Sequence, residues 1–100
     1  MIRHIVFFRL AENALGKTKA DNAVSIKTQL EALKDEIPQI VSIEVGLNHN
    51  QNSSAWDIAL VCEFRTKQDL EIYQTHPAHK KAAQFVADVR TDRAVVDYEV

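Results

Sequence analysis

The spacing of apolar residues changes its period several times along the chain, and the order of these changes limits the folds that it can adopt. Alternating apolar residues predict strands at residues 2–10, 40–47, 56–64 and 90–100. Between the first two strands the apolar period lengthens to that of an amphipathic helix, at Ala23, Ile26, Leu30, Leu33 and Ile37. A second helical region follows the third strand. The order is therefore β-α-β-β-α-β, and we expect an α+β chain whose residues 1–100 form a single domain.

This order of elements is that of the split β-α-β, or ferredoxin-like, fold. The fold has a four-stranded antiparallel sheet, and we expect residues 2–10 and 56–64 to form its central strands. Both helical regions then lie on one face of the sheet. We assign the more apolar set of side chains to that helix-covered face, namely His4, Val6, Phe8, Ile58, Leu60, Val96 and Tyr98.

The other face of the sheet keeps an apolar centre that no helix covers. We expect the outer strands to be polar on this face. Its apolar residues lie on the two central strands and are Ile5, Phe7, Ala59 and Val61. An exposed apolar patch with a polar rim is typical of a protein interface. We therefore predict a homodimer in which two sheets pack face to face. The alternative is a monomer with a partly apolar outer face.

The region around Pro77 holds two of the four histidines. Proline lacks an N–H group and suits the first position of a helix, so we predict one helix that ends near Thr75 and another that begins at Pro77. In the second helix His79 shares a face with apolar residues and is expected to point inward, towards Tyr73 and His4. Two imidazoles and a phenol in one interior have the chemistry of a base, an orienting group and a hydrogen-bond donor to a carbonyl.

Composition disfavours several classes of function. A formal net charge of −2 and scattered basic residues argue against binding to nucleic acid or anionic membranes. No apolar run is long enough to span a membrane, and residues 1–10 are typical of a strand rather than a signal peptide. The lone cysteine, Cys62, lies in an apolar strand and predicts a buried thiol in a reducing cytoplasm.

The sequence also lacks the usual signatures of bound groups. His76 and His79 are three residues apart, but no cysteine or carboxylate completes a set of three or four ligands, so we predict no metal site. There is neither a Gly-x-Ser-x-Gly motif nor a phosphate-binding glycine loop, and we expect no cofactor.

Over its whole length the chain resembles the stress-responsive alpha-beta barrel (Dabb) family. The Tyr-x-x-His-Pro-x-His run at residues 73–79 is the most specific part of the match. The other matching segments are Ile2-Arg3-His4-Ile5-Val6-Phe7-Phe8, Ile43-Glu44-Val45-Gly46, Trp56-Asp57-Ile58-Ala59-Leu60-Val61-Cys62-Glu63-Phe64 and Val95-Val96-Asp97-Tyr98. The resemblance implies a ferredoxin-like dimer, that is, a dimeric α/β barrel.

What the resemblance implies for activity is less specific. Many bacterial members have no assigned activity, and plant members are similar to stress proteins that assemble from stable dimers. One related plant protein is a cofactor-independent polyketide cyclase, and the match to it implies catalytic roles for His79 and Tyr73 and a pocket role for His4. A further pocket tyrosine of that enzyme has no counterpart in the first helix, which reads Val24-Ser25-Ile26-Lys27. Its absence argues against the same substrate.

Three functions therefore remain open from the sequence. The first is a Dabb-type homodimer that binds a small, largely apolar ligand between helices and sheet, through His4, Tyr73, His76 and His79. The second is a cofactor-independent enzyme of cyclase type, with His79 as base and Tyr73 as orienting group. The third is a structural stress protein that acts through assembly, in which these side chains are satisfied core residues. A continuous cavity bounded by Tyr73, His79 and His4 separates the first two functions from the third.

Overall fold

A computed structural model describes all residues from Met1 to Val100. Its strands are β1 (Ile2–Leu10), β2 (Asn13–Ala14), β3 (Lys17–Thr18), β4 (Ile40–Leu47), β5 (Ile58–Phe64) and β6 (Arg90–Glu99). Its helices are α1 (Lys19–Glu31), α2 (Leu33–Glu36), α3 (Lys67–Thr75) and α4 (Pro77–Val89).

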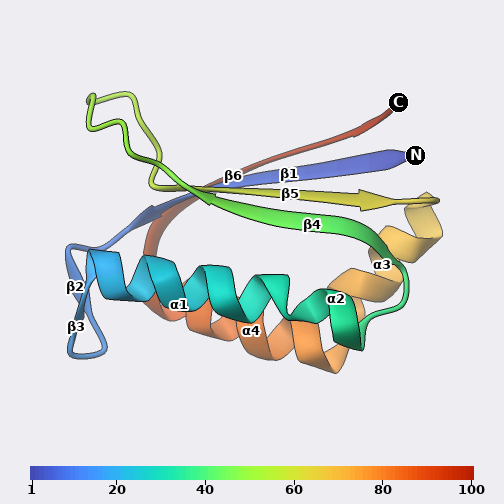
Figure 1. Cartoon of the computed structure of the whole chain (residues 1–100), viewed down its shortest axis with the longest axis horizontal. Coiled ribbons are helices and arrows are strands. Elements are labelled where there is room, and N and C mark those ends of the chain that lie inside the picture. The colour runs from blue at the N-terminus through green and yellow to red at the C-terminus, as the bar shows by residue number, and fades with distance from the viewer.

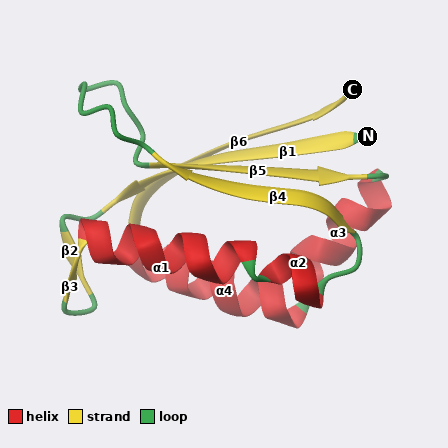
Figure 2. Ribbon diagram, viewed as in Figure 1, coloured by secondary structure: helices red, strands yellow, loops and turns green.

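The main sheet is antiparallel and has the strand order β4-β5-β1-β6, so β1 and β5 are central. All four helices lie on one side of it, as Figures 1 and 2 show. We call the face towards the helices the inner face and the opposite face the outer face. The predicted ferredoxin-like α+β fold is thus confirmed, with the central strands that the sequence indicated. None of the helices is long and apolar enough to cross a membrane.

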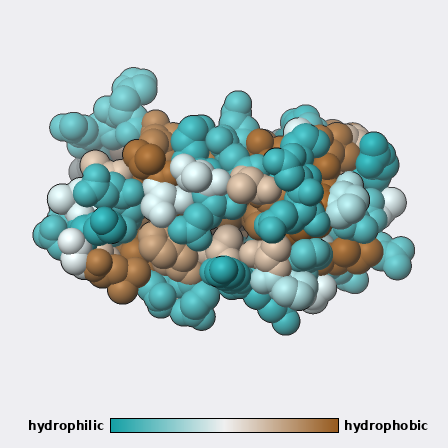
Figure 3. Space-filling view, turned by 60° about the horizontal axis from the view of Figure 1, so that its bottom comes forward, coloured by the Kyte–Doolittle hydropathy of each residue, from teal (hydrophilic) through white to brown (hydrophobic).

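The hydrophobic core lies between the inner face and the helices. Alternate residues of β1 and β5 point into it, and the helical stripe that the sequence predicted is buried there at Ile26, Leu30, Leu33 and Ile37. Each fully buried side chain of this kind stabilises the fold by about 1.5–3 kcal/mol. The helix side that faces solvent is mostly hydrophilic, with separate hydrophobic patches, in Figure 3.

Two local features differ from the sequence prediction. The loop expected before the first helix contains a small hairpin, β2–β3, whose turn residues Leu15 and Gly16 have φ values of 52° and 74°. Positive φ at both positions suits a two-residue hairpin turn. The long first helix is divided at Ala32, where Asp35 N–H donates to the Ala32 carbonyl at 3.2 Å. That i to i+3 bond tightens the helix locally to 3₁₀ geometry.

The assignment of Val96 and Tyr98 to the helix-covered face is wrong. In the pairing of β6 with β1, Val96 stands opposite Ile5 and Tyr98 opposite Arg3, so both point to the outer face. A strand's alternation defines two sets of residues, but only the register decides which set faces the helices. Here α4 ends at Val89 and β6 begins at Arg90 with no turn between them.

This register changes the character of both faces of β6. On the outer face, Ala94, Val96 and Tyr98 extend the apolar patch that the sequence confined to the central strands. The outer strand β6 is therefore not polar there, contrary to the prediction. On the inner face, Val95 stands opposite Val6 yet is 45% exposed. The helices consequently leave the inner face of β6 partly open.

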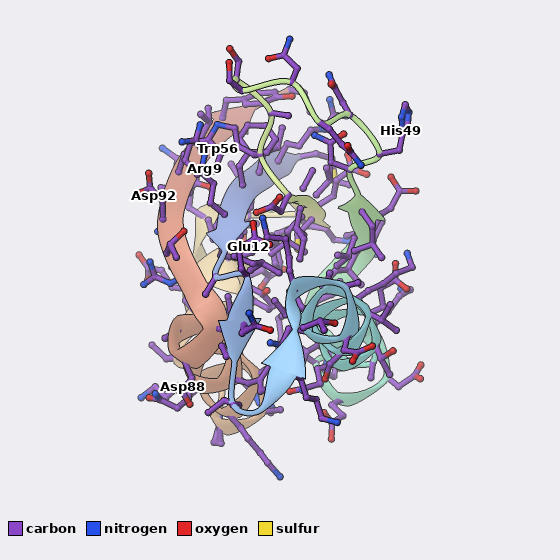
Figure 4. The ribbon with its side chains drawn as sticks, turned by 90° about the vertical axis from the view of Figure 1, so that its left-hand side faces the viewer. Arg9, Glu12, His49, Trp56, Asp88 and Asp92 are labelled. Atoms are coloured by element: carbon purple, nitrogen blue, oxygen red, sulfur yellow. The ribbon has the colours of Figure 1, made fainter.

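The segment between β4 and β5 rises above the sheet on its outer side (Figure 1). His49 lies exposed on it and points away from the molecule in Figure 4. Trp56 precedes β5 and stacks under the Arg9 guanidinium, with 4.3 Å between the guanidinium carbon and the ring centre. Figure 4 shows this pair beside β6. Trp56 also lines a cavity of about 340 Å³ on the outer face with Phe7.

Candidate functional site

The structure brings together three of the four side chains that the sequence singled out. Tyr73 lies between the two histidines, with its ring centre 4.3 Å from that of His79 and 6.2 Å from that of His4. Phe64 from β5 packs against the same phenol at 5.0 Å. We call His4, Tyr73 and His79 the ring cluster. It occupies the inner face of β1 below the junction of α3 and α4.

The break between α3 and α4 positions two members of the cluster. Thr66 caps α3 by accepting a hydrogen bond from Asp69 N–H at 3.1 Å, and α3 then carries Tyr73 inward on its last turn. Pro77 is the first residue of α4, and the first turn of that helix places His79 against Tyr73. His76 has a different role in this structure, because its Nδ1 accepts a hydrogen bond from Ala78 N–H at 3.0 Å and caps α4.

His4 is held by a residue that sequence reasoning did not select. Its Nδ1 donates to the Asp97 carboxylate at 2.5 Å, since an ionised carboxylate can only accept. Asp97 stands directly opposite His4 in the pairing of β1 with β6. His4 is 3% exposed, so the bond lies at the edge of the core. The sequence alone does not indicate this role of Asp97, because it depends on the register in which β6 pairs with β1.

His79 is held by the backbone. Its Nδ1 lies 3.2 Å from the Gln74 carbonyl oxygen and must donate its proton there, because a carbonyl can only accept. Burial lowers the pKa of His79, the bond to Gln74 opposes this, and the charges of His4, Arg93 and His76 lower it further. The neutral ring therefore carries its lone pair on Nε2, which has no hydrogen-bond partner in the protein and, unlike the Tyr73 hydroxyl, is not fully buried.

The Tyr73 hydroxyl is buried and makes no hydrogen bond of good geometry. Burial raises its pKa above the ordinary range, and the neighbouring Cys62 thiol raises it further. That thiol is itself a weak partner, and burial raises its own pKa to about 12. Tyr73 thus remains a neutral donor beside one weak acceptor, and Cys62 is the buried thiol that the sequence predicted.

A groove of about 400 Å³ runs between α3 and β6 beside the cluster. We call it the α3–β6 groove, and the residues lining it include Lys67, Leu70, Glu71, Gln74, Asp97 and Glu99. It reaches the two residues that hold the histidines, Gln74 and Asp97. None of His4, Tyr73 and His79 lines this groove or either of the two other cavities, so these cavities do not supply the continuous cavity that separates ligand binding and catalysis from a structural role. The cluster is closely packed, and both of its histidines hydrogen-bond to protein.

The largest hollow lies at the opposite end of the molecule, about 1080 Å³ in volume, between the β4–β5 segment and the start of α1. It is an open groove with mixed polar walls. No set of three or more His, Cys, Asp or Glu side chains is placed to bind a metal ion. The ring cluster itself offers proton donors and acceptors, namely the Tyr73 hydroxyl and the ring nitrogens of His4 and His79.

Known proteins similar to this chain share its fold over nearly its whole length. A dimeric protein of unknown function with a ferredoxin-like fold, from Bacteroides fragilis NCTC 9343, is 40% identical, with a TM-score of 0.88 and coverage of 99% of this chain and 95% of that one. A dimeric ferredoxin-like protein from Thermobifida fusca is 26% identical, with a TM-score of 0.84 and coverage of 99% and 90%.

The stress-response A/B barrel domain-containing protein DABB1 of Arabidopsis thaliana is 25% identical over 98% of this chain. The chain spans only 46% of the length of that relative. The model of the stress responsive A/B barrel domain matches residues 2–100. With the ferredoxin-like sheet and the Tyr-x-x-His-Pro-x-His junction already in place, this match over nearly the whole chain shows that the protein belongs to the stress-responsive A/B barrel (Dabb) family.

Proposed function

We propose that this protein is a homodimer in which each subunit binds a small, largely apolar carbonyl compound between the α3–α4 junction and the sheet. The observation that carries the proposal is the Tyr73 hydroxyl, which is 0% exposed as a residue and has no hydrogen-bond partner. A buried hydroxyl without a partner costs about 1–3 kcal/mol, and native proteins keep few of them. A ligand oxygen that accepts from Tyr73 supplies the missing hydrogen bond.

The surroundings of Tyr73 suit an uncharged ligand with one polar group. Phe64 and Leu70 contribute apolar walls, and the neutral His79 offers a second polar atom, Nε2, that is also without a partner. A predominantly apolar site with a few convergent polar groups is the usual form of a small-molecule site. Asp97 fixes the orientation of His4 on the opposite wall.

Entry of the ligand requires a local movement. The rings of the cluster pack against one another, and the α3–β6 groove reaches only Gln74 and Asp97, the residues that hold the two histidines. The side chain of Gln74 is exposed and holds no hydrogen bond; only its backbone carbonyl binds His79. We propose that rotation of the Gln74 side chain opens the groove towards Tyr73, since the bond to His79 involves only the backbone carbonyl. Rotamer changes of exposed side chains take picoseconds to nanoseconds.

A titration with acetophenone, followed through the ring signals of the four histidines by NMR, tests this function. We expect the signals of His4 and His79 to shift with saturation. His49 lies on an exposed segment far from the cluster and serves as the internal control. Absence of any shift at His4 and His79, or equal small shifts at all four histidines, contradicts the proposal.

A cofactor-independent enzyme is the second candidate, and the state of His79 favours it. A neutral imidazole with a free Nε2 is a proton acceptor, and Tyr73 beside it is a proton donor that burial keeps protonated. With a bound ketone, Nε2 takes a proton from the carbon next to the carbonyl. The electrons of that C–H bond form the enolate, and the Tyr73 hydroxyl donates to its oxygen.

Hydrogen exchange at the methyl group of acetophenone in D₂O measures this step without knowledge of the natural substrate. An enzyme of this kind accelerates exchange in proportion to protein concentration, and His79→Gln abolishes the acceleration. Exchange at the buffer rate contradicts the enzymatic role.

The third role, a structural protein that acts through assembly, draws support from the two histidines already bonded to protein. The Tyr73→Phe experiment described in the Discussion separates it from ligand binding.

The dimer interface that we propose is the outer face of the sheet. Its apolar surface comprises Ile5, Phe7, Ala59 and Val61, enlarged by Ala94, Val96 and Tyr98 on β6. Val96 is 55% exposed and Phe7 36% exposed in the single chain. The ion pair of Arg3 and Glu63, at 3.2 Å, forms part of a polar rim. Both solved relatives are described as dimeric, which supports a homodimer of this chain. The buried free thiol of Cys62 supports a reducing compartment such as the cytoplasm.

A further inference from the structure

The α3–β6 groove has an uneven distribution of charge. Lys67 and Glu71 line it from α3, and Asp97 and Glu99 line it from β6, so one positive and three negative groups leave a formal charge of −2. Asp97 is engaged by His4. The side chains of Lys67, Glu71 and Glu99 form no ion pair and are exposed. The two free carboxylates therefore face any ligand that approaches along the groove.

The charge near the ring cluster has the opposite sign. Arg93 stands opposite Phe8 on the inner face of β6, the same face as Asp97, and forms no ion pair. Its charge lowers the pKa of His79 and opposes the rise in the pKa of Tyr73. The neighbourhood of the cluster thus favours the negative end of a ligand dipole, whereas the groove disfavours a net negative charge.

We propose that the α3–β6 groove is the entrance to the ring cluster and that it selects uncharged or cationic carbonyl compounds over carboxylates and phosphate esters. The inference rests on the proposed ligand function and names the class of ligand. A neutral ketone passes Glu71 and Glu99 without repulsion, and its oxygen, the negative end of the carbonyl dipole, meets the Tyr73 donor. An anion of the same size is repelled at the groove before it reaches that donor.

Three aromatic compounds that each carry a carbonyl oxygen test the selection: acetophenone is neutral, 4-(aminomethyl)acetophenone is a cation at neutral pH and benzoate is an anion. Each is titrated at low ionic strength while the ring signals of His4 and His79 are followed by NMR, with His49 as the control. We expect the Kd of benzoate to exceed those of the other two by about tenfold or more. Raised salt narrows this difference, because it screens exposed charges.

Two sets of variants locate the selection in the groove. The double variant Glu71→Gln/Glu99→Gln removes both free carboxylates at nearly constant size, and both side chains are exposed, so the fold is retained. We expect it to lower the Kd of benzoate by about threefold or more and to leave that of acetophenone unchanged. Lys67→Gln is the matched control, because it removes the positive charge that lines the groove. It should raise the Kd of benzoate.

The outcomes separate this inference from the function on which it rests. Equal Kd values for the three compounds overturn the charge selection and leave the ligand site intact. A preference that persists unchanged in the Glu71→Gln/Glu99→Gln variant overturns the route through this groove. Absence of a shift at His4 and His79 with all three compounds overturns the ligand function and the inference together.

Discussion

The inner and outer faces of the sheet are both rich in apolar residues, yet they leave different groups without partners. On the inner face the helices cover the apolar side chains, and what remains open is hydrogen-bonding capacity, at the Tyr73 hydroxyl and at Nε2 of His79. On the outer face Phe7 and Val96 stay partly exposed in the single chain, and what remains open is apolar area. Unpaired polar atoms suit a small molecule with one polar group, whereas a broad apolar surface suits a second protein.

The largest expected effect comes from a charge on the outer face. Phe7→Glu removes a central apolar side chain and places a carboxylate at the same point of both subunits. Loss of two phenylalanines buried by the dimer, at about 1.5–3 kcal/mol each, predicts that dimer dissociation is favoured by about 100-fold or more. Sedimentation equilibrium at micromolar concentration then finds monomers.

The matched control for that change lies on the other side of the molecule. Val24 on α1 is 56% exposed to solvent, so Val24→Glu introduces the same charge on the helix side and should leave the dimer intact. A dimer of undiminished affinity in Phe7→Glu, or dissociation in both variants, contradicts the assignment of the interface to the outer face.

Asp97→Asn affects the inner face by an intermediate amount. The substitution replaces a charged acceptor of the His4 Nδ1–H by a neutral one. Because the Asp97 side chain is 40% exposed, we expect a loss of only about 1–2 kcal/mol in the free energy of unfolding. Urea unfolding measures it. Asp92→Asn, also on β6, keeps the side-chain oxygen that accepts from Arg93 N–H and should change stability by less than about 0.5 kcal/mol. Equal effects of the two variants contradict a specific role for Asp97.

Tyr73→Phe tests whether the unpaired hydroxyl has a structural role. Removal of a buried group that lacks a partner should leave stability unchanged or raise it by up to about 1 kcal/mol. The same change should weaken acetophenone binding about fivefold or more, since one hydrogen bond to the ligand is lost. Tyr98 lines the α3–β6 groove, where its hydroxyl accepts from Arg3, so Tyr98→Phe should change acetophenone binding by much less than Tyr73→Phe. A destabilised Tyr73→Phe protein with no change in ligand affinity supports the structural interpretation instead.

The smallest expected effect is a dependence of stability on pH. Burial lowers the pKa of His79 in the folded protein below its ordinary value near 6.5. As the pH falls below that value, the unfolded chain binds a proton at His79 before the folded protein does, so the folded protein loses stability. The loss is complete once the pH lies below the pKa of His79 in the folded protein. His79→Gln removes this contribution, so its unfolding free energy should change less between neutral pH and pH 5. Identical pH profiles for the two proteins contradict a depressed pKa at His79.

The fold was largely predictable because its elements carry strong local patterns. The bounds of β1 and β4 match the expected strands, and the stripe from Ile26 to Ile37 is buried as expected. The β2–β3 hairpin was missed because Leu15 at positive φ is not a usual turn residue. The side of the sheet on which Val96 and Tyr98 lie was predicted wrongly. Alternation along β6 separates its residues into two sets but does not show which set points towards the helices.

The site was predictable in part for the same physical reason. The helix break at Pro77 follows from the chemistry of proline, and with it the approach of Tyr73 to His79. Asp97 depends on the pairing of β6 with β1, a contact between residues 93 positions apart that no local pattern encodes. The unpaired state of the Tyr73 hydroxyl is likewise a property of three-dimensional packing.

A crystal structure of the protein grown with acetophenone tests the contrast between the two faces most directly. The account predicts a two-fold dimer joined through the outer face, around Phe7 and Val96. It also predicts the ketone beside the ring cluster, with its oxygen within hydrogen-bond distance of the Tyr73 hydroxyl. A molecule without ligand density in which Tyr73 donates to a protein group, or a dimer formed through another surface, contradicts it.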